Sequence, residues 1–245
     1  MASTSPWRIG SAVVYPGGVD FGMVTPRVIS LDLDDTLWPI APVLAAAEGE
    51  LSSWLATHHP RAMQGHDIDS MRRLRARVAS LHPGQSHDMT FLRRQALTLQ
   101  FAAAGYAPGP VEEALEVFMR GRNRVELYAD VPAALERLRG KYRLLALSNG
   151  NADLERGGVA HWFDGHITAA AAGAAKPDAR IFAALVRAAG VPAGEVLYVG
   201  DDPLADVVGA TRAGLQSVWL NREARVWPAG FAPPARTVTS LTEIE

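Results

Sequence analysis

Four short polar clusters contain the residue types that could carry out chemistry in this chain. Carboxylates held close together repel one another and raise their own pKa values unless a cation compensates them. Mg²⁺ is a natural compensator, because it takes a few carboxylates, water and a substrate phosphate as oxygen ligands. We therefore expect Asp32 and Asp201 to be magnesium ligands, with Asp202 or Asp206 supporting them. The clusters are Asp32-Leu33-Asp34-Asp35-Thr36, Ser148-Asn149-Gly150, Lys176-Pro177, and Gly200-Asp201-Asp202 with Asp206.

The spacing of Asp32 and Asp34 suits transfer of a phosphoryl group. If the chain leaves a strand after Asp32, both carboxylates can face one phosphorus atom. Asp32 would attack it to form an aspartyl-phosphate, and Asp34 would serve as general acid and then general base. The Ser148 hydroxyl, backbone amides and the Lys176 ammonium would hold the phosphoryl oxygens. The chain has 22 arginines and two lysines, so Lys176 stands where a compact point charge serves better than a guanidinium.

Short apolar runs lead into three of these clusters, as is typical of buried parallel strands. Strands are predicted at 28–31, 143–147, 196–199 and 217–220. Helices are predicted between them at 131–139, with Asp130 as N-cap, at 178–189, ended by Gly190, and at 203–213. This alternation predicts an α/β fold with a doubly wound parallel sheet. Ligands bind such sheets at the carboxyl ends of the strands, where the polar clusters stand.

Residues 39–128 interrupt the alternation. Apolar residues recur there at helical spacing, with breaks near His59-Pro60, His82-Pro83-Gly84 and 105–110. This pattern predicts a bundle of about four helices inserted after the first strand. The chain is therefore divided into a catalytic core of residues 23–38 and 129–245 and a helical domain at 39–128.

The bulk composition is that of an ordinary globular protein without an obvious anionic partner. The 245 residues are 48% hydrophobic and carry a formal net charge of −2, so neither nucleic acid nor a membrane surface is expected as a partner. No apolar run approaches the ~20 residues that span a bilayer. Residues 1–22 lack the basic start and apolar block of a secretion signal, so we expect a poorly ordered leader and a cytoplasmic protein.

Each acidic residue also has a structural interpretation. Asp32 and Asp34 could form a turn after a strand, and Asp35 could cap the turn that follows. Asp202 and Asp206 could complement the dipole at the start of a helix. The presence of Ser148, Lys176 and Asp201 favours a functional role for the first pair, whereas the second pair stays open between the two.

The arginines of the insert have two interpretations as well. The run at 72–77 lies on a predicted amphipathic helix without interleaved aromatic residues, which favours a solvated helix face over a nucleic-acid site. Arg93 and Arg94 could reach an anionic substrate or form surface ion pairs. Trp38, just after the first cluster, could line the site or pack in the core.

Together the four clusters resemble the ordered motifs of the haloacid dehalogenase-like hydrolase superfamily. The matching segments are Asp32 to Leu37, Ser148 to Gly150, Lys176-Pro177 and Gly200 to Asp206, in that order. The insert at 39–128 looks like the C1 helical cap of this superfamily, which closes over the site and selects substrates. The resemblance implies a Rossmann-like α/β core beneath that cap.

The resemblance also implies a role for each site residue. Dehalogenases of this superfamily lack a carboxylate two residues after the nucleophile, so the presence of Asp34 implies a phosphatase. Asp32 would be the nucleophile and Asp34 the acid/base. Mg²⁺ would be held by Asp32, Asp201 and the backbone carbonyl of Asp34. The residues that would bind the substrate are Thr36, Ser148, Asn149 and Lys176.

A narrower resemblance covers nearly all of residues 27–230. The segments 32–38, 87–90 and 148–151 are similar to a bacterial phosphatase group that acts on FMN and on 5-amino-6-(5-phospho-D-ribitylamino)uracil, an intermediate of riboflavin biosynthesis. This resemblance implies a small phosphorylated metabolite as substrate. Two rivals remain. One is a phosphatase or mutase for another sugar or nucleoside phosphate, and the other is a non-catalytic module that binds a phospho-ligand.

Overall fold

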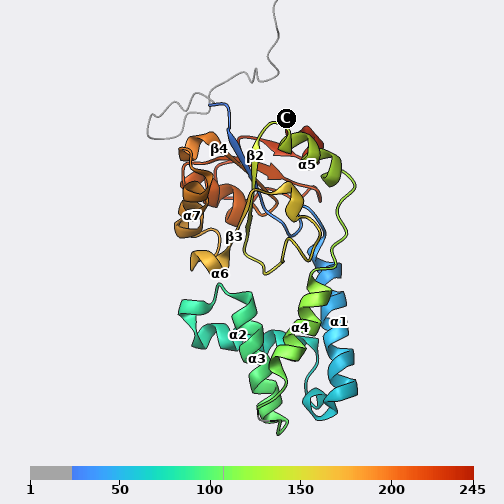
Figure 1. Cartoon of the computed structure of the whole chain (residues 1–245). Helices are drawn as coiled ribbons and strands as arrows, with labels where there is room; N and C mark the ends of the chain where they lie inside the picture. Colours follow the sequence, from blue (N-terminus) through green and yellow to red (C-terminus); the bar gives the residue numbers. More distant parts are fainter. Residues whose placement is uncertain (1–23, 107) are drawn as a thin grey trace, which may run out of the picture.

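The computed structural model describes residues 24–106 and 108–245 (Figure 1). The leader expected at residues 1–22 lies outside this part of the chain. Two units are visible in Figure 1: a sheet flanked by helices, and a group of helices at one end of it. Within the described residues, no helix is both long and apolar enough to cross a membrane.

The sheet has six parallel strands in the order β3-β2-β1-β4-β5-β6. The strand β1 lies at the centre, with Val28 opposite Arg143 of β2 and Val196 of β4. The three central strands are almost wholly buried, which explains why they read as continuous apolar runs. Their bounds are Val28–Leu31 (β1), Arg143–Ser148 (β2), Gly165–Thr168 (β3), Val196–Gly200 (β4), Gln216–Leu220 (β5) and Thr237–Val238 (β6).

Helices cover both faces of the sheet, as a doubly wound fold requires. Successive residues of β1 point to opposite faces, so Ile29 and Leu31 join one hydrophobic cluster and Val28 joins the other. The first cluster contains α5 (Val131–Arg139), and the second contains α7 (Ala179–Ala189) and part of α8 (Gly209–Arg212). The short helix α6 (Ala169–Ala172) follows β3. The predicted fold class is confirmed.

Three local predictions are corrected. The strands β3 and β6 were not predicted from the sequence. The helix predicted at 203–213 is a π-helix, Pro203–Val208, followed by the four-residue α8. Asp130 precedes α5 but its carboxylate does not cap it; that carboxylate accepts hydrogen bonds from Arg222, Ser240 and the Leu241 amide instead.

The insert consists of four helices with a hydrophobic cluster of their own. Its helices are α1 (Ile40–His58), α2 (Ile68–Leu81), α3 (Met89–Ala103) and α4 (Val111–Arg122). They end near the breaks that the sequence predicts. The cluster includes Leu51, Leu55, Leu97, Phe101 and Phe118, and none of these residues belongs to the clusters of the sheet. The helices therefore pack mainly on one another, beyond the end of β1 from which α1 departs (Figure 1).

Candidate active site

A buried ammonium and two carboxylates lie at the carboxyl ends of the central strands. Asp32 directly follows β1, Lys176 precedes α7, and Asp206 lies in the π-helix after β4. The Lys176 Nζ is 2.5 Å from Asp32 Oδ1 and 2.7 Å from Asp206 Oδ1. It also donates to the Tyr198 hydroxyl at 3.0 Å, and that hydroxyl donates to Asp206 Oδ1 at 2.9 Å. One lysine thus holds two acidic side chains that are otherwise shielded from water.

Asn149 fixes the backbone of Lys176. Its Oδ1 accepts from the Lys176 amide at 2.7 Å, and its Nδ2 donates to the Lys176 carbonyl at 3.0 Å. Both polar atoms of the side chain are therefore engaged with the protein. Asn149 therefore places the lysine, and the substrate-binding role expected for it stays a prediction.

Three carboxylates crowd together at this point. Oxygen atoms of Asp32, Asp201 and Asp206 all lie within 4.8 Å of one another. Burial raises the pKa of Asp32 well above its ordinary value, although Lys176 works in the opposite direction. Burial and the neighbouring Asp206 raise the pKa of Asp201 to about 6. Such a set of hard oxygen donors, short of positive charge, fits a divalent cation.

Gly200 lets Asp206 reach the cluster. A Cβ at Gly200 would lie 2.4 Å from Asp206 Cγ, so a larger residue would displace that carboxylate. Asp206 Oδ2 accepts from the Asp202 amide at 2.9 Å. The Asp202 carboxylate is exposed and accepts from the amides of Leu204 and Ala205, which makes it the cap of the π-helix. Of the two residues expected to support the metal ligands, Asp206 lies among the crowded carboxylates and Asp202 does not.

Asp34 stands apart from the three crowded carboxylates. Its oxygens accept from Arg122 Nη2 at 2.8 and 2.7 Å and from Trp38 Nε1 at 2.8 Å. Asp35 has a left-handed backbone with φ of 61°, and its Oδ1 accepts from the Ile40 amide at the start of α1. The structural interpretation of Asp35 is therefore supported, whereas Asp34 points toward the insert.

Ser148 and Asp34 meet at Gly150. The Ser148 Oγ accepts from the Gly150 amide at 2.8 Å. A Cβ at Gly150 would lie 2.6 Å from Asp34 Oδ2 and 3.2 Å from Ser148 Oγ, so only glycine allows this approach. Thr36, expected to bind substrate, is fully buried, and its hydroxyl has no hydrogen-bond partner within residues 24–106 and 108–245. The substrate-binding role expected for Thr36 stays a prediction.

The loop after β2 also contacts the insert directly. Asn151 Nδ2 donates to Thr90 Oγ1 at 3.1 Å, in the first turn of α3. Two segments singled out by the narrower resemblance, 87–90 and 148–151, are thus brought together.

Several residues at the site were missed by the sequence reasoning. Arg122 is one arginine among 22 and lies 88 residues from Asp34, so no local pattern marks it. Tyr198 lies within the apolar strand β4, where the sequence pattern predicts only a core residue. Arg225 donates to Asp201 Oδ2 at 2.8 Å from a loop without a recognisable motif.

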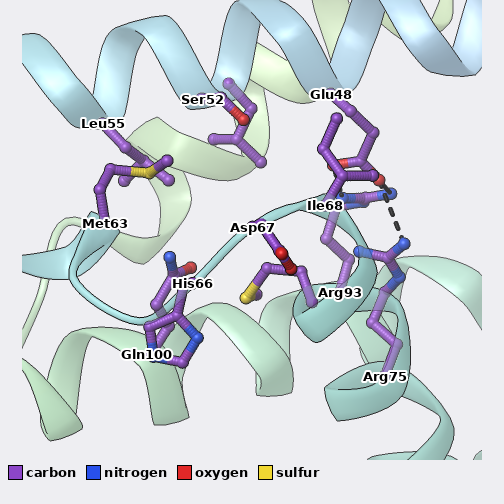
Figure 2. A pocket seen from close by; sticks show the side chains of 12 residues that line it. Glu48, Ser52, Leu55, Met63, His66, Asp67, Ile68, Arg75, Arg93 and Gln100 are labelled. Atoms are coloured by element: carbon purple, nitrogen blue, oxygen red, sulfur yellow. Dashed lines mark hydrogen bonds and ion pairs between the residues drawn. The ribbon is translucent and has the colours of Figure 1, made fainter.

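A separate cavity of about 20 Å³ lies within the insert (Figure 2). Glu48, Arg75 and Arg93 lie together at one side of it. Arg93 donates to Glu48 at 2.9 and 3.2 Å, and Arg94 pairs with Glu112 on the surface. Both arginines considered for substrate contact therefore pair with residues of the insert, Arg93 in its interior and Arg94 on its surface.

Comparison with known proteins defines the class of this chain. A model of the haloacid dehalogenase-like hydrolases matches residues 26–214, and the chain belongs to that family. Among curated proteins, the 5-amino-6-(5-phospho-D-ribitylamino)uracil phosphatase YigB of Escherichia coli is 32% identical over 213 residues, which cover 84% of this chain and 89% of YigB. The phosphoserine phosphatase of Thermus thermophilus is 38% identical over 147 residues, 58% of this chain and 59% of that protein.

A solved structure is similar over nearly the whole fold. The 2-haloacid dehalogenase from Pseudomonas syringae pv. tomato DC3000 has a TM-score of 0.84 and 33% identity, covering 89% of this chain and 96% of that one. The family match and the phosphatases among its relatives identify this chain as an enzyme, a phosphatase of the haloacid dehalogenase-like family.

Proposed function

We propose that this enzyme hydrolyses a small phosphomonoester with Mg²⁺ through an aspartyl-phosphate on Asp32. The observation that carries the proposal is the position of Asp32. Its carboxylate is 2.5 Å from the Lys176 ammonium and beside the carboxylates of Asp201 and Asp206. A second carboxylate two residues along the chain, Asp34, is held by different partners. Two acidic groups in such unlike surroundings can take different roles in one reaction.

In the first step, Asp32 attacks the phosphorus atom. A bond forms between a carboxylate oxygen and phosphorus while the bond from phosphorus to the leaving oxygen breaks. Asp34 gives its proton to that leaving oxygen, which departs as an alcohol. Lys176 and Ser148 compensate the charge on the phosphoryl oxygens.

In the second step, a water molecule releases phosphate. Asp34, now a carboxylate, takes a proton from that water as its oxygen bonds to phosphorus and the bond to Asp32 breaks. Asp32 and Asp201 would hold Mg²⁺ through their side chains, and Asp34 through its backbone carbonyl. When bound, the ion would supply positive charge both to the crowded carboxylates and to the phosphoryl group.

The substrates that we propose are 5-amino-6-(5-phospho-D-ribitylamino)uracil and FMN. The first of these is supported by YigB, which is named as its phosphatase and whose similarity to this chain reaches 89% of YigB and so includes the insert. Both molecules carry a phosphate on a ribityl chain, so one site could accept either. A metabolite of this kind would be met in the cytoplasm, the location expected from the sequence.

Release of inorganic phosphate from a panel of substrates tests the proposal. The panel holds the two ribityl phosphates, phosphoserine, sugar phosphates and nucleotides, each with Mg²⁺ and with EDTA. We expect Mg²⁺-dependent turnover that is fastest on the ribityl phosphates and is abolished by Asp32→Asn. Faster turnover of another phosphate would retain the mechanism and reject the substrate. Halide release from 2-chloropropionate without phosphate release would reject both.

A further inference from the structure

Arg122 joins the insert to the proposed acid/base. It is the last residue of α4 and is 1% exposed. One nitrogen, Nη2, lies 2.8 Å from Asp34 Oδ1 and 2.7 Å from Asp34 Oδ2. The orientation of a carboxylate in the core is therefore fixed by a helix whose own packing belongs to the insert.

The surroundings of this pair place it within the reacting region. A Cβ at Gly150 would lie 3.0 Å from Arg122 Nη2 and 3.2 Å from Ser148 Oγ. The guanidinium thus packs against Gly150, whose amide donates a hydrogen bond to Ser148, the residue proposed to bind phosphate. Trp38 donates to Asp34 Oδ1 at 2.8 Å, so Asp34 accepts hydrogen bonds from both the insert and the core.

A second arginine of the insert shows what a purely cohesive pair looks like. Arg93 uses Nη1 and Nη2 on the two oxygens of Glu48 and lies over the ring of Phe118 at 3.2 Å. Arg122, by contrast, places only Nη2 on Asp34, and within the described chain its buried Nη1 has no hydrogen-bond partner. A guanidinium can pair with a carboxylate through two nitrogens, but Arg122 uses only one. The contact that orients Asp34 therefore leaves Nη1 without a hydrogen-bond partner among the described residues.

We infer that Arg122 is a positioning residue for Asp34, and that proton transfer to the leaving oxygen depends on α4 being seated against the core. The inference rests on the proposed function, because it needs Asp34 to act as the acid/base. A general acid works only within hydrogen-bond distance of the atom it protonates. Small displacements of a catalytic group cost large factors in rate. Loss of Arg122 should therefore slow the step that needs the proton more than it weakens binding.

The choice of leaving group separates this role from a structural one. A ribityl or other alkyl leaving oxygen needs a proton as it departs, whereas p-nitrophenolate leaves without one. For Arg122→Gln we expect kcat/KM on an alkyl phosphate to fall about 100-fold, because kcat/KM reports the step in which Asp34 protonates the leaving oxygen and general acid catalysis contributes factors of this size. On p-nitrophenyl phosphate we expect kcat/KM to fall about threefold or less, whereas kcat can fall on both substrates because Asp34 is also the base for the shared hydrolysis of the aspartyl-phosphate. A fault in folding or phosphate binding would lower kcat/KM on both substrates alike.

The matched control is Arg124→Gln. Arg124 lies two residues further on and pairs with Glu50 at the surface, so both substrates should react as in the wild type. Arg122→Lys should recover part of the alkyl-phosphate rate, because it restores the charge and one donor. Trp38→Phe removes the other donor to Asp34 while keeping a buried ring, and should show the same substrate split more weakly. It gives an independent reading if Arg122→Gln proves unstable by circular dichroism.

Equal losses of kcat/KM on the two substrates would overturn the inference while leaving the phosphatase proposal intact. The wild-type enzyme is measured first on both substrates. Absence of phosphate release there would reject the proposed function itself, before any variant is compared.

Discussion

Two clusters of buried charge, one in the core and one in the insert, differ in how their charges balance. In the core, the Lys176 ammonium and the Arg225 guanidinium face the three carboxylates of Asp32, Asp201 and Asp206, which leaves an excess of negative charge. In the insert, two guanidiniums share the single carboxylate of Glu48, which leaves an excess of positive charge (Figure 2). Both clusters are shielded from water, so burial alone does not distinguish them.

The surroundings of each excess charge decide its role. In the insert, Arg93 is spread over the face of Phe118, and burial lowers its pKa to about 10, so it stays charged near neutral pH. The arginines and Glu48 link α1, α2 and α3 to one another. In the core, the excess lies at the carboxyl ends of the strands, where a cation and a phosphate would meet it. Crowding of like charges at such an edge indicates a site, whereas opposite charges between helices indicate cohesion.

The largest expected effect is that of Lys176→Met. Removal of the ammonium leaves the buried carboxylates of Asp32 and Asp206 without compensation, which should lower the free energy of unfolding by about 3–5 kcal/mol in the absence of metal. Phosphate release should fall by at least ~10³-fold, because the charge on the phosphoryl group also loses its partner. Urea unfolding in EDTA and a phosphate assay with Mg²⁺ measure the two effects.

A charge-preserving variant sharpens this result. In Lys176→Arg the larger guanidinium must fit where Nζ is within 3.0 Å of Asp32, Asp206 and Tyr198. We expect most of the stability to return and most of the activity to stay lost, since the point charge is displaced. Wild-type activity in Lys176→Arg would show that charge alone suffices at this position.

The corresponding change in the insert is Glu48→Gln. It leaves Arg93 and Arg75 without their carboxylate, which should cost about 2–4 kcal/mol of unfolding free energy. The folded variant should keep kcat/KM within about threefold of the wild type, because Glu48 touches no reacting group. Loss of activity in a protein that remains folded would break the comparison, since it would give the insert cluster a role in the reaction.

The core of the fold could be predicted because its physical signal is local. Buried parallel strands are apolar on both faces, so β1 was bounded correctly and β2, β4 and β5 nearly so. The strand β3 was missed because it lies at the edge of the sheet, and its four residues, Gly165 to Thr168, are only partly buried. The strand β6 has two residues, too few to show any period.

The site was predictable only where strand ends bring its residues together. The topology carries Asp32, Asp201 and Lys176 to one edge of the sheet, as expected from their positions. The choice between Asp202 and Asp206 depends on which side chain a π-helix turns inward, and the sequence does not show that turn. Arg122 reaches Asp34 only after the whole insert has folded, so its position follows from tertiary packing.

Asp130 provides a carboxylate in the core that is fully paired. Burial acts to raise the pKa of Asp130, but hydrogen bonds from Ser240, Arg222 and the Leu241 amide outweigh it and leave the pKa lowered. Stability from this group is therefore present above the unfolded pKa of about 3.9 and is lost as the pH falls through the lower, folded value. We expect Asp130→Asn to cost about 2 kcal/mol at pH 7.

The pH dependence of the unfolding free energy tests whether the charged carboxylate of Asp130 contributes this stability. The difference in unfolding free energy between wild type and Asp130→Asn, from urea titrations between pH 7 and pH 3, should shrink below pH 4. A difference that stays constant down to pH 3 would mean that the bonds do not depend on the charged carboxylate. Asp130→Asn should retain activity at pH 7, because this paired carboxylate lies outside the cluster of Asp32, Asp201 and Asp206.

The smallest effect is expected for Arg94→Gln, next to Arg93 in the insert. The pair of Arg94 and Glu112 has good geometry at 2.7 Å, but these side chains are 40% and 71% exposed. Water and salt screen such a pair, so its removal should change the unfolding free energy by less than about 1 kcal/mol. Urea unfolding at low and at high salt measures this, with Glu48→Gln beside it. An effect of Arg94→Gln as large as that of Glu48→Gln would show that burial is not what gives the insert cluster its strength, and the contrast between the two clusters would then have to rest on charge balance alone.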